Sequence, residues 1–148
     1  MKHRWAALVF GLALGALVPR SAEAQEPNPP PNRERTPGVE LGQNYPNPFN
    51  PTTTIPFTLG DYPSCADAHV YRVTLQIYNI VAQMVAIPIL QGGTAAGQQL
   101  VELQLPCGTY TAYWDGRDVN SREVSSGVYL YRLVVDGKVY VKKMLVMK

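Results

Sequence analysis

The chain has 148 residues, a length that suits one domain of ordinary size. It holds 13 Lys and Arg against 11 Asp and Glu, but three of these basic residues and one of the acidic residues fall within positions 1–24. The ten basic and ten acidic side chains that remain are balanced. Binding to nucleic acid or to an anionic membrane requires an excess of positive charge, which this balance does not provide. We therefore expect no nucleic-acid partner.

The first 24 residues have the layout of a secretory signal peptide. Residues 2–4 are basic, residues 5–18 are apolar, and residues 22–24 (Ala-Glu-Ala) form a small-x-small cleavage site. The apolar run is too short for a stable membrane helix. An uncleaved anchor is the weaker interpretation, because no stop-transfer cluster follows. We expect export to the periplasm, the outer-membrane surface or the extracellular space.

Residues 25–42 contain five prolines among polar residues and almost no apolar side chains. Such a segment buries too little surface to offset the entropy of ordering, so it predicts a disordered or polyproline-II linker.

From residue 52 onward, apolar residues recur with the period of two that is typical of half-buried strands. This alternation predicts strands over residues 52–59, 71–78, 84–90, 100–105, 109–114, 127–135 and 138–147. The spacing predicts an all-β fold, an Ig-like β-sandwich of about seven strands. Trp114 would be the largest side chain of its core.

Two positions predict irregular features. Pro56 lacks a backbone N–H, which places its strand at a sheet edge. Lys142 and Lys143 interrupt the alternation of the last strand, which predicts a bulge or a change of face there.

Three sequence blocks occur in order along the chain. The first block consists of Tyr45, Pro46, Asn47, Pro48, Phe49, Asn50 and Pro51, the second of Trp114, Asp115 and Gly116, and the third is the hairpin sequence Gly127–Lys148 with its Asp136-Gly137 turn. Together they resemble the type A C-terminal sorting domain of the type IX secretion system (the Por secretion tail). This domain is a relative of the Ig-like domain of flagellar hook-capping proteins. The resemblance covers residues 43–148, which we take as the domain.

The resemblance implies a non-catalytic module that carries its protein across the outer membrane. Family members are then commonly trimmed and attached to surface lipopolysaccharide, or released. The implied partners are secretion machinery proteins. By the same analogy the hairpin is the sorting signal, with expected recognition residues Gly127, Val128, Tyr129, Tyr131, Lys142, Lys143 and Lys148. Among these, the lysines would be charged recognition points, while Val128 and the tyrosines would hold the hairpin in place, together with Leu133. Trp114, Asp115 and Gly116 would fix the neighbouring turn.

Each block also has a purely structural interpretation. The proline-spaced block over residues 45–51 could be a rigid docking strip, but packing of Tyr45 and Phe49 over the open end of the sandwich explains it more simply. The lysines of the hairpin could only protect an edge strand from association. The two roles of the lysines are compatible, because strand addition to an exposed edge is a mode of recognition.

Cys65 and Cys107 are the two cysteines of an exported chain, which favours one disulfide over two free buried thiols. The resemblance adds that Cys107 replaces a small residue in a Leu-Pro-x-Gly sequence and that Cys65 lies in an insertion over residues 60–68. A bridge across about 40 residues would stabilise the fold by about 3–4 kcal/mol.

Two turns depart from the family pattern, because Ala82 and Ser121 stand where glycine is usual. Ala82 either keeps a positive φ at a cost of about 1 kcal/mol, or its loop is reshaped. Asp115, Asp118 and Asn120 suggest a calcium site, but their spacing is unlike that of a calcium loop, so a glycine turn is the better interpretation.

The sequence holds little that could support catalysis. Beyond residue 24 the one histidine is His69, and the common nucleophile, metalloprotease and phosphate-loop motifs are absent. We expect no enzyme activity, no cofactor and no small-molecule substrate. The alternative to sorting is a small periplasmic or surface Ig-like module with a structural or adhesive role, a remnant without a passenger domain.

Overall fold

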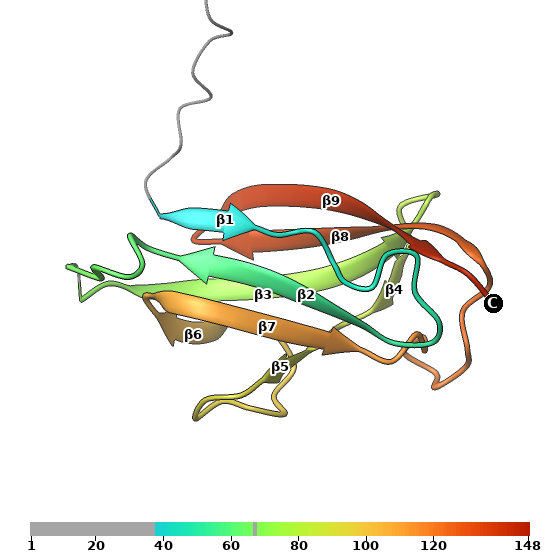
Figure 1. The fold of residues 1–148 in the computed structure, drawn as a ribbon, viewed down its shortest axis with the longest axis horizontal. Helices are drawn as coiled ribbons and strands as arrows, with labels where there is room; N and C mark the ends of the chain where they lie inside the picture. The colour runs from blue at the N-terminus through green and yellow to red at the C-terminus, as the bar shows by residue number, and fades with distance from the viewer. Residues whose placement is uncertain (1–37, 67) are drawn as a thin grey trace, which may run out of the picture. The chain divides into compact units, whose positions relative to one another are not determined.

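Alternation of buried and exposed side chains builds two antiparallel sheets that pack face to face (Figure 1). The structure, a computed structural model, describes residues 38–66 and 68–148. These belong to one compact unit, Glu34–Lys148. The expected signal peptide over residues 1–24 lies outside the described residues, as does most of the expected linker. The prediction of an all-β sandwich is confirmed.

The described residues form nine strands. The first sheet has the order β1 (Val39–Leu41), β2 (Thr53–Leu59), β7 (Gly108–Trp114) and β5 (Ile89–Gln91). The second sheet has the order β4 (Met84–Ala86), β3 (Val70–Asn79), β8 (Gly127–Val135) and β9 (Lys138–Val146), and β6 (Leu103–Pro106) also pairs with β3. Within the part of the chain that is described, no helix is both long and apolar enough to span a bilayer.

One of the two additional strands arises where a predicted strand changes sheets. The expected strand over residues 84–90 is interrupted at Ile87 and Pro88. Its first part, β4, pairs with β3 in the second sheet, and its second part, β5, pairs with β7 in the first. A period of two continues through such a crossing, so the pattern alone does not reveal it.

The other additional strand, β1, lies within the segment predicted to be a linker, and that prediction is wrong for Val39–Leu41. These residues follow the last proline of the segment and pair with β2, and Leu41 is buried. As a result β2 lies between β1 and β7, so the prediction of an edge strand is also wrong.

The sheet tolerates Pro56 because β1 ends beside it. Gly42 donates its N–H to the Pro56 carbonyl at 2.8 Å. A Cβ at position 42 would lie 2.6 Å from Cγ of the proline ring, so glycine fits this close approach. The missing donor of Pro56 faces Gly42 and not β7, so the pairing of β2 with β7 loses no hydrogen bond.

Two further expectations for strands are wrong. The strand expected over residues 100–105 begins only at Leu103, because Glu102 adopts a φ of 47° and Leu100 takes the buried position in place of the exposed Val101. The bulge expected at Lys142 and Lys143 does not form. The register of β8 with β9 is continuous from Gly127↔Val146 to Val135↔Lys138.

The turn at Asn79–Gln83 keeps the conformation usual for glycine. Ala82 has a φ of 59°, so the first of the two alternatives for this turn is confirmed. The Asn79 side-chain oxygen accepts hydrogen bonds from the N–H groups of Val81 and Gln83 at 3.1 and 2.9 Å. Ser121 likewise has a φ of 62°.

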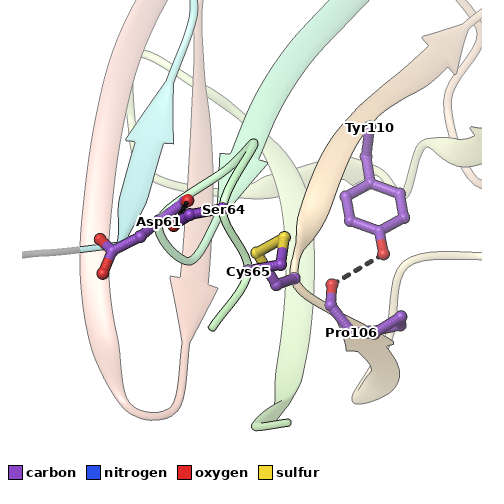
Figure 2. The surroundings of a disulfide bond; sticks show 6 residues. Asp61, Ser64, Cys65, Pro106 and Tyr110 are labelled. Atoms are coloured by element: carbon purple, nitrogen blue, oxygen red, sulfur yellow. Dashed lines mark hydrogen bonds between the residues drawn. A yellow bond between two sulfur atoms is a disulfide. The ribbon is translucent and has the colours of Figure 1, made fainter. Parts of the chain in front are cut away.

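The expected disulfide joins Cys65 to Cys107, with a Cα–Cα distance of 5.6 Å (Figure 2). It ties the loop after β2 to the single residue between β6 and β7. Gly60 lies against it, because a Cβ there would come within 2.7 Å of the Cys107 sulfur. In Figure 2 the Tyr110 hydroxyl donates to the Pro106 carbonyl at 2.7 Å beside the bridge. The prediction of a bridge is therefore confirmed.

Replacement of both cysteines by serine (Cys65→Ser with Cys107→Ser) should lower the free energy of unfolding by about 3–4 kcal/mol, because the bridge closes a long loop of the unfolded chain. Urea unfolding of the variant and of the native chain measures this difference. Native protein treated with a reductant should match the variant, and unchanged stability in both would contradict the prediction.

Candidate functional site

The three blocks that carry the family resemblance meet in one aromatic cluster. Phe49, Trp114 and Tyr129 are all buried. The ring of Trp114 makes edge-on contacts with Phe49, at a centroid distance of 5.4 Å, and with Tyr129, at 5.9 Å. Such contacts add about 0.5–1.5 kcal/mol each to the burial of the rings. The cluster therefore holds the start of β8 against the first sheet and the proline-rich block.

The loop after Trp114 holds the end of the proline-rich block. The indole N–H donates to the Arg117 carbonyl at 2.8 Å, and the Asp115 carboxylate accepts from the Arg117 N–H at 3.0 Å. Gly116 has a φ of +75°, and a Cβ there would lie 2.3 Å from the Pro51 carbonyl oxygen. The motif thus needs glycine for both its conformation and this contact.

Asp118, which sequence analysis considered as a calcium ligand, is used by its own loop. Its carboxylate accepts from the N–H groups of Asn120 and Arg122 and forms an ion pair with the Arg122 guanidinium at 3.1 Å. The hydrogen bond from the Arg122 N–H, helped by these other contacts, lowers the pKa of Asp118. The partners of this carboxylate are therefore residues of its own loop.

The proline-rich block packs through one of its two aromatic residues. Phe49 is buried as expected, whereas the Tyr45 side chain is 54% exposed, so the packing role expected for Tyr45 is wrong. Tyr45 instead exchanges two backbone hydrogen bonds of 2.9 Å with Thr54. The Asn47 side-chain oxygen accepts a hydrogen bond from the Leu145 N–H of β9 at 3.0 Å.

This block also covers half of the outer edge of β9. The Phe49 N–H donates to the Leu145 carbonyl, and the Met147 N–H donates to the Phe49 carbonyl, both at 3.0 Å. The Gln43 side chain donates to the Lys143 carbonyl at 3.1 Å. The sequence predicted an exposed hairpin edge, but the edge from Lys143 onward is bonded to residues about 100 positions earlier.

Tyr131 supplies a second tie between the hairpin and the start of the domain. Its side chain is fully buried, and its hydroxyl donates to the Gly42 carbonyl at 2.8 Å and accepts from the Asn44 N–H at 3.0 Å. Burial raises the pKa of Tyr131, which keeps the phenol protonated and able to donate. The Gly42 carbonyl is available because Pro56 has no N–H to offer it.

The residues expected to be read by a partner do not form one surface. Tyr129 and Tyr131 are buried, and Lys142 lies half-buried opposite Tyr131. Val128 is 43% exposed rather than packed, and the side chain of Lys143 is also exposed. Lys148 forms an ion pair with Glu123 at 3.2 Å, and Gly127 adopts a φ of +148°.

The contact that fixes the hairpin turn was not predicted from the sequence. The Asp136 carboxylate lies 2.7 Å from Nε2 of His69 and accepts from the Arg72 N–H at 2.8 Å. The hydrogen bond from the Arg72 N–H is the main reason that the pKa of Asp136 is lowered, and the contact with His69 adds to it. An aspartate at a tight turn commonly accepts hydrogen bonds from nearby backbone N–H groups, so a bonded Asp136 could have been expected. The sequence does not indicate that the donor lies in β3.

The chemistry open to these side chains is limited. Both cysteines form the disulfide, so neither is a thiol nucleophile. Within residues 38–66 and 68–148, no three His, Cys, Asp or Glu side chains gather closely enough to hold a metal ion.

No protein-family model and no curated protein matches this chain. Among solved structures it is similar to dimeric latent PorU from Porphyromonas gingivalis, with a TM-score of 0.51 and 19% identity over 74% of this chain. The chain spans only 9% of the length of PorU, and at this identity the likeness shows the fold alone.

Two weaker likenesses carry no argument. PorZ, described as an essential surface component of the type IX secretion system of the same organism, has a TM-score of 0.41 and 18% identity, covering 75% of this chain and 12% of PorZ. The DNA glycosylase AlkC of Pseudomonas fluorescens has a TM-score of 0.43 and 14% identity, covering 76% of this chain and 31% of AlkC.

Replacement of Phe49 by alanine should lower the free energy of unfolding by about 3–5 kcal/mol, because it removes a buried ring from the cluster. The Met147 amide, bonded to Phe49, should also exchange its hydrogen faster. Chemical unfolding and hydrogen exchange measure the two effects. Tyr45→Ala is the matched control and should change stability by less than about 1 kcal/mol, because that ring is exposed. Equal losses in the two variants would contradict the cluster's role.

The lowered pKa of Asp136 predicts a loss of stability in acid. The fold stabilises the ionised form of this carboxylate. Its full contribution to the free energy of unfolding is present above the pKa of the unfolded chain, near 3.9, and is lost as the pH falls through the lower pKa of the folded chain. Asp136→Asn, which also tolerates the positive φ of 48°, should therefore be less stable than the native chain above about pH 4. The difference should shrink toward pH 2 in urea unfolding measured across this range. Parallel curves for the two proteins would refute this assignment.

Proposed function

We propose that residues 38–148 form a non-catalytic sorting module. The module directs export across the outer membrane, followed by attachment to the cell surface or release, as the resemblance to type A sorting domains implies. The observation that carries the proposal is the cluster of Phe49, Trp114 and Tyr129, in which the three family blocks meet. Blocks scattered over some 80 residues of sequence thus serve a single purpose, the fixing of the β8–β9 hairpin.

This arrangement keeps the holding role expected of Tyr129 and Tyr131 and reduces the set of residues that a partner could contact. Both tyrosines pack in the core beneath the hairpin, so a partner cannot contact them in the folded domain. A secretion machinery protein would meet the outward-facing residues instead, which include Val128 and Lys143. The secretion machinery would therefore recognise the surface of the folded module.

The absence of catalysis belongs to the same proposal. Support comes from the bonded cysteines and from His69, which is engaged with Asp136 at the tip of the hairpin. The engaged carboxylate serves to hold the turn against β3.

A second candidate is an Ig-like structural or adhesive module that binds another protein without being exported by this route. It is favoured by the exposed aliphatic residues on the outer face of the hairpin, Val128, Val139, Val141 and Leu145. Such residues in a contiguous group are typical of a protein-binding surface.

A reporter fusion separates the two candidates. A periplasmic enzyme fused ahead of residues 25–148, in a bacterium that has the secretion system, should reach the cell surface or the medium. Fractionation and protease accessibility measure its location. Retention of a folded fusion in the periplasm would reject the sorting function and favour the second candidate.

Charge variants of the same fusion test the hairpin. Lys143→Gln should reduce delivery several-fold, because a charge at the rim of an interface chiefly affects the rate of encounter. Arg122→Gln, which removes an exposed positive charge on another loop, is the matched control and should leave delivery unchanged. Equal delivery of both variants would remove Lys143 from the proposed surface.

A further inference from the structure

The part of β9 nearest the hairpin turn has an unpaired backbone edge. Alternate residues of an antiparallel strand direct their N–H and C=O groups to the same side. The Leu145 and Met147 groups point away from β8, toward the proline-rich block, so those of Val139 and Val141 point away from β8 as well. Among residues 38–66 and 68–148, the outward groups of Val139 and Val141 have no hydrogen-bond partner. We call Val139–Val141 the open edge.

The open edge is left uncovered because residues 43–49, which cover the rest of β9, are preceded by β1, and β1 is part of the first sheet. Residues 43–49 bond to β9 from Lys143 onward. The preceding β1 lies next to β9 but gives its backbone hydrogen bonds to β2. The groups of Gly42 are likewise taken, its N–H by Pro56 and its carbonyl by Tyr131.

The hairpin around the open edge is positively charged. Strands β8 and β9 together contain no acidic residue and four basic residues, Arg132, Lys138, Lys142 and Lys143. None of these four forms an ion pair with another described residue. Lys138 and Lys142 point to one face of the strand, whereas Val139 and Val141 point to the other, with 48% and 52% exposure.

We propose that the open edge binds an extended peptide of alternating acidic and aliphatic residues, which joins the second sheet as a further strand. The acidic side chains would lie beside Lys138 and Lys142, and the aliphatic ones beside Val139 and Val141. The inference rests on the proposed function, for which it supplies the partner's chemistry: an acidic extended segment of a secretion machinery protein. Lysines that only protect the edge from association would bind no such peptide.

The test uses the chain purified after export and a fluorescein-labelled acetylated peptide, Glu-Val-Glu-Val-Glu-Val amide. Fluorescence anisotropy at low salt should show saturable binding that weakens as salt is added. Two further peptides carry N-methyl groups on the Glu amides or on the Val amides. Only one alternate set of amides faces the edge, so one methylated peptide should bind and the other should not. Equal binding of both would overturn strand addition.

Val141→Pro is the decisive variant. The N–H of Val141 points away from β8, so proline removes no bond of the sheet but blocks an incoming strand. We expect at least a tenfold loss of affinity for the peptide, about 1.4 kcal/mol, whereas Val141→Thr, which keeps the N–H, should bind like the native chain. Lys138→Glu with Lys142→Glu, a second variant that leaves the backbone intact, should lose binding to a similar degree. Thermal unfolding verifies that each variant is folded.

Binding that Val141→Pro and the double lysine variant abolish, and that Val141→Thr retains, would establish the inference. No binding to the native chain, or equal binding to the folded Val141→Pro variant, would overturn it. This outcome does not depend on the reporter fusion, whose retention in the periplasm would reject the sorting function even if the peptide binds.

Discussion

The contact of Trp114 with Phe49 on one side and Tyr129 on the other is the interaction on which the arrangement of the hairpin depends. The three rings come from a loop, the end of β7 and the start of β8. Because Trp114 contacts both other rings, we expect substitutions at these three positions to have non-additive effects on stability. Gly116 then allows the loop to approach Pro51 closely enough for the cluster to close.

The covering of β9 divides the hairpin into two parts of different character. From Lys143 onward its edge is bonded to residues 43–49, which protects a strand that could otherwise associate with other chains. Toward the turn, no other described residue is bonded to the edge, and Lys138 and Lys142 lie beside it. One strand therefore combines a permanently paired portion with a portion that is available for pairing.

The sequence predicted the strands that alternate simply and failed where pairing depends on distant residues. The alternation over residues 71–78 predicted a strand, and β3 forms there with Val73, Leu75 and Ile77 fully buried. The edge position of β2 was wrong, because Pro56 indicates only that one donor is missing and not which side of the strand it faces. That side is occupied by Gly42, which no local pattern assigns to β2.

The candidate site was predictable in its components but not in its geometry. The motif residues Phe49 and Trp114 were recognised from sequence, and the disulfide was expected from two cysteines in an exported chain. The pairing of Asn47 with Leu145 could not be foreseen, because a hydrogen bond across 98 residues leaves no periodic signal. The same holds for the contact of His69 with Asp136.

The bonds from residues 43–49 to β9 also determine when the domain can finish folding. A chain that emerges from a ribosome or a membrane pore beginning at its N-terminus presents this block long before Leu145. The bond between Asn47 and Leu145 must therefore wait until both ends of a 98-residue span are free together, and contacts of such long range form slowly. Until then residues 43–49 have none of these partners, and the sheet edge that they cover in the folded domain does not yet exist.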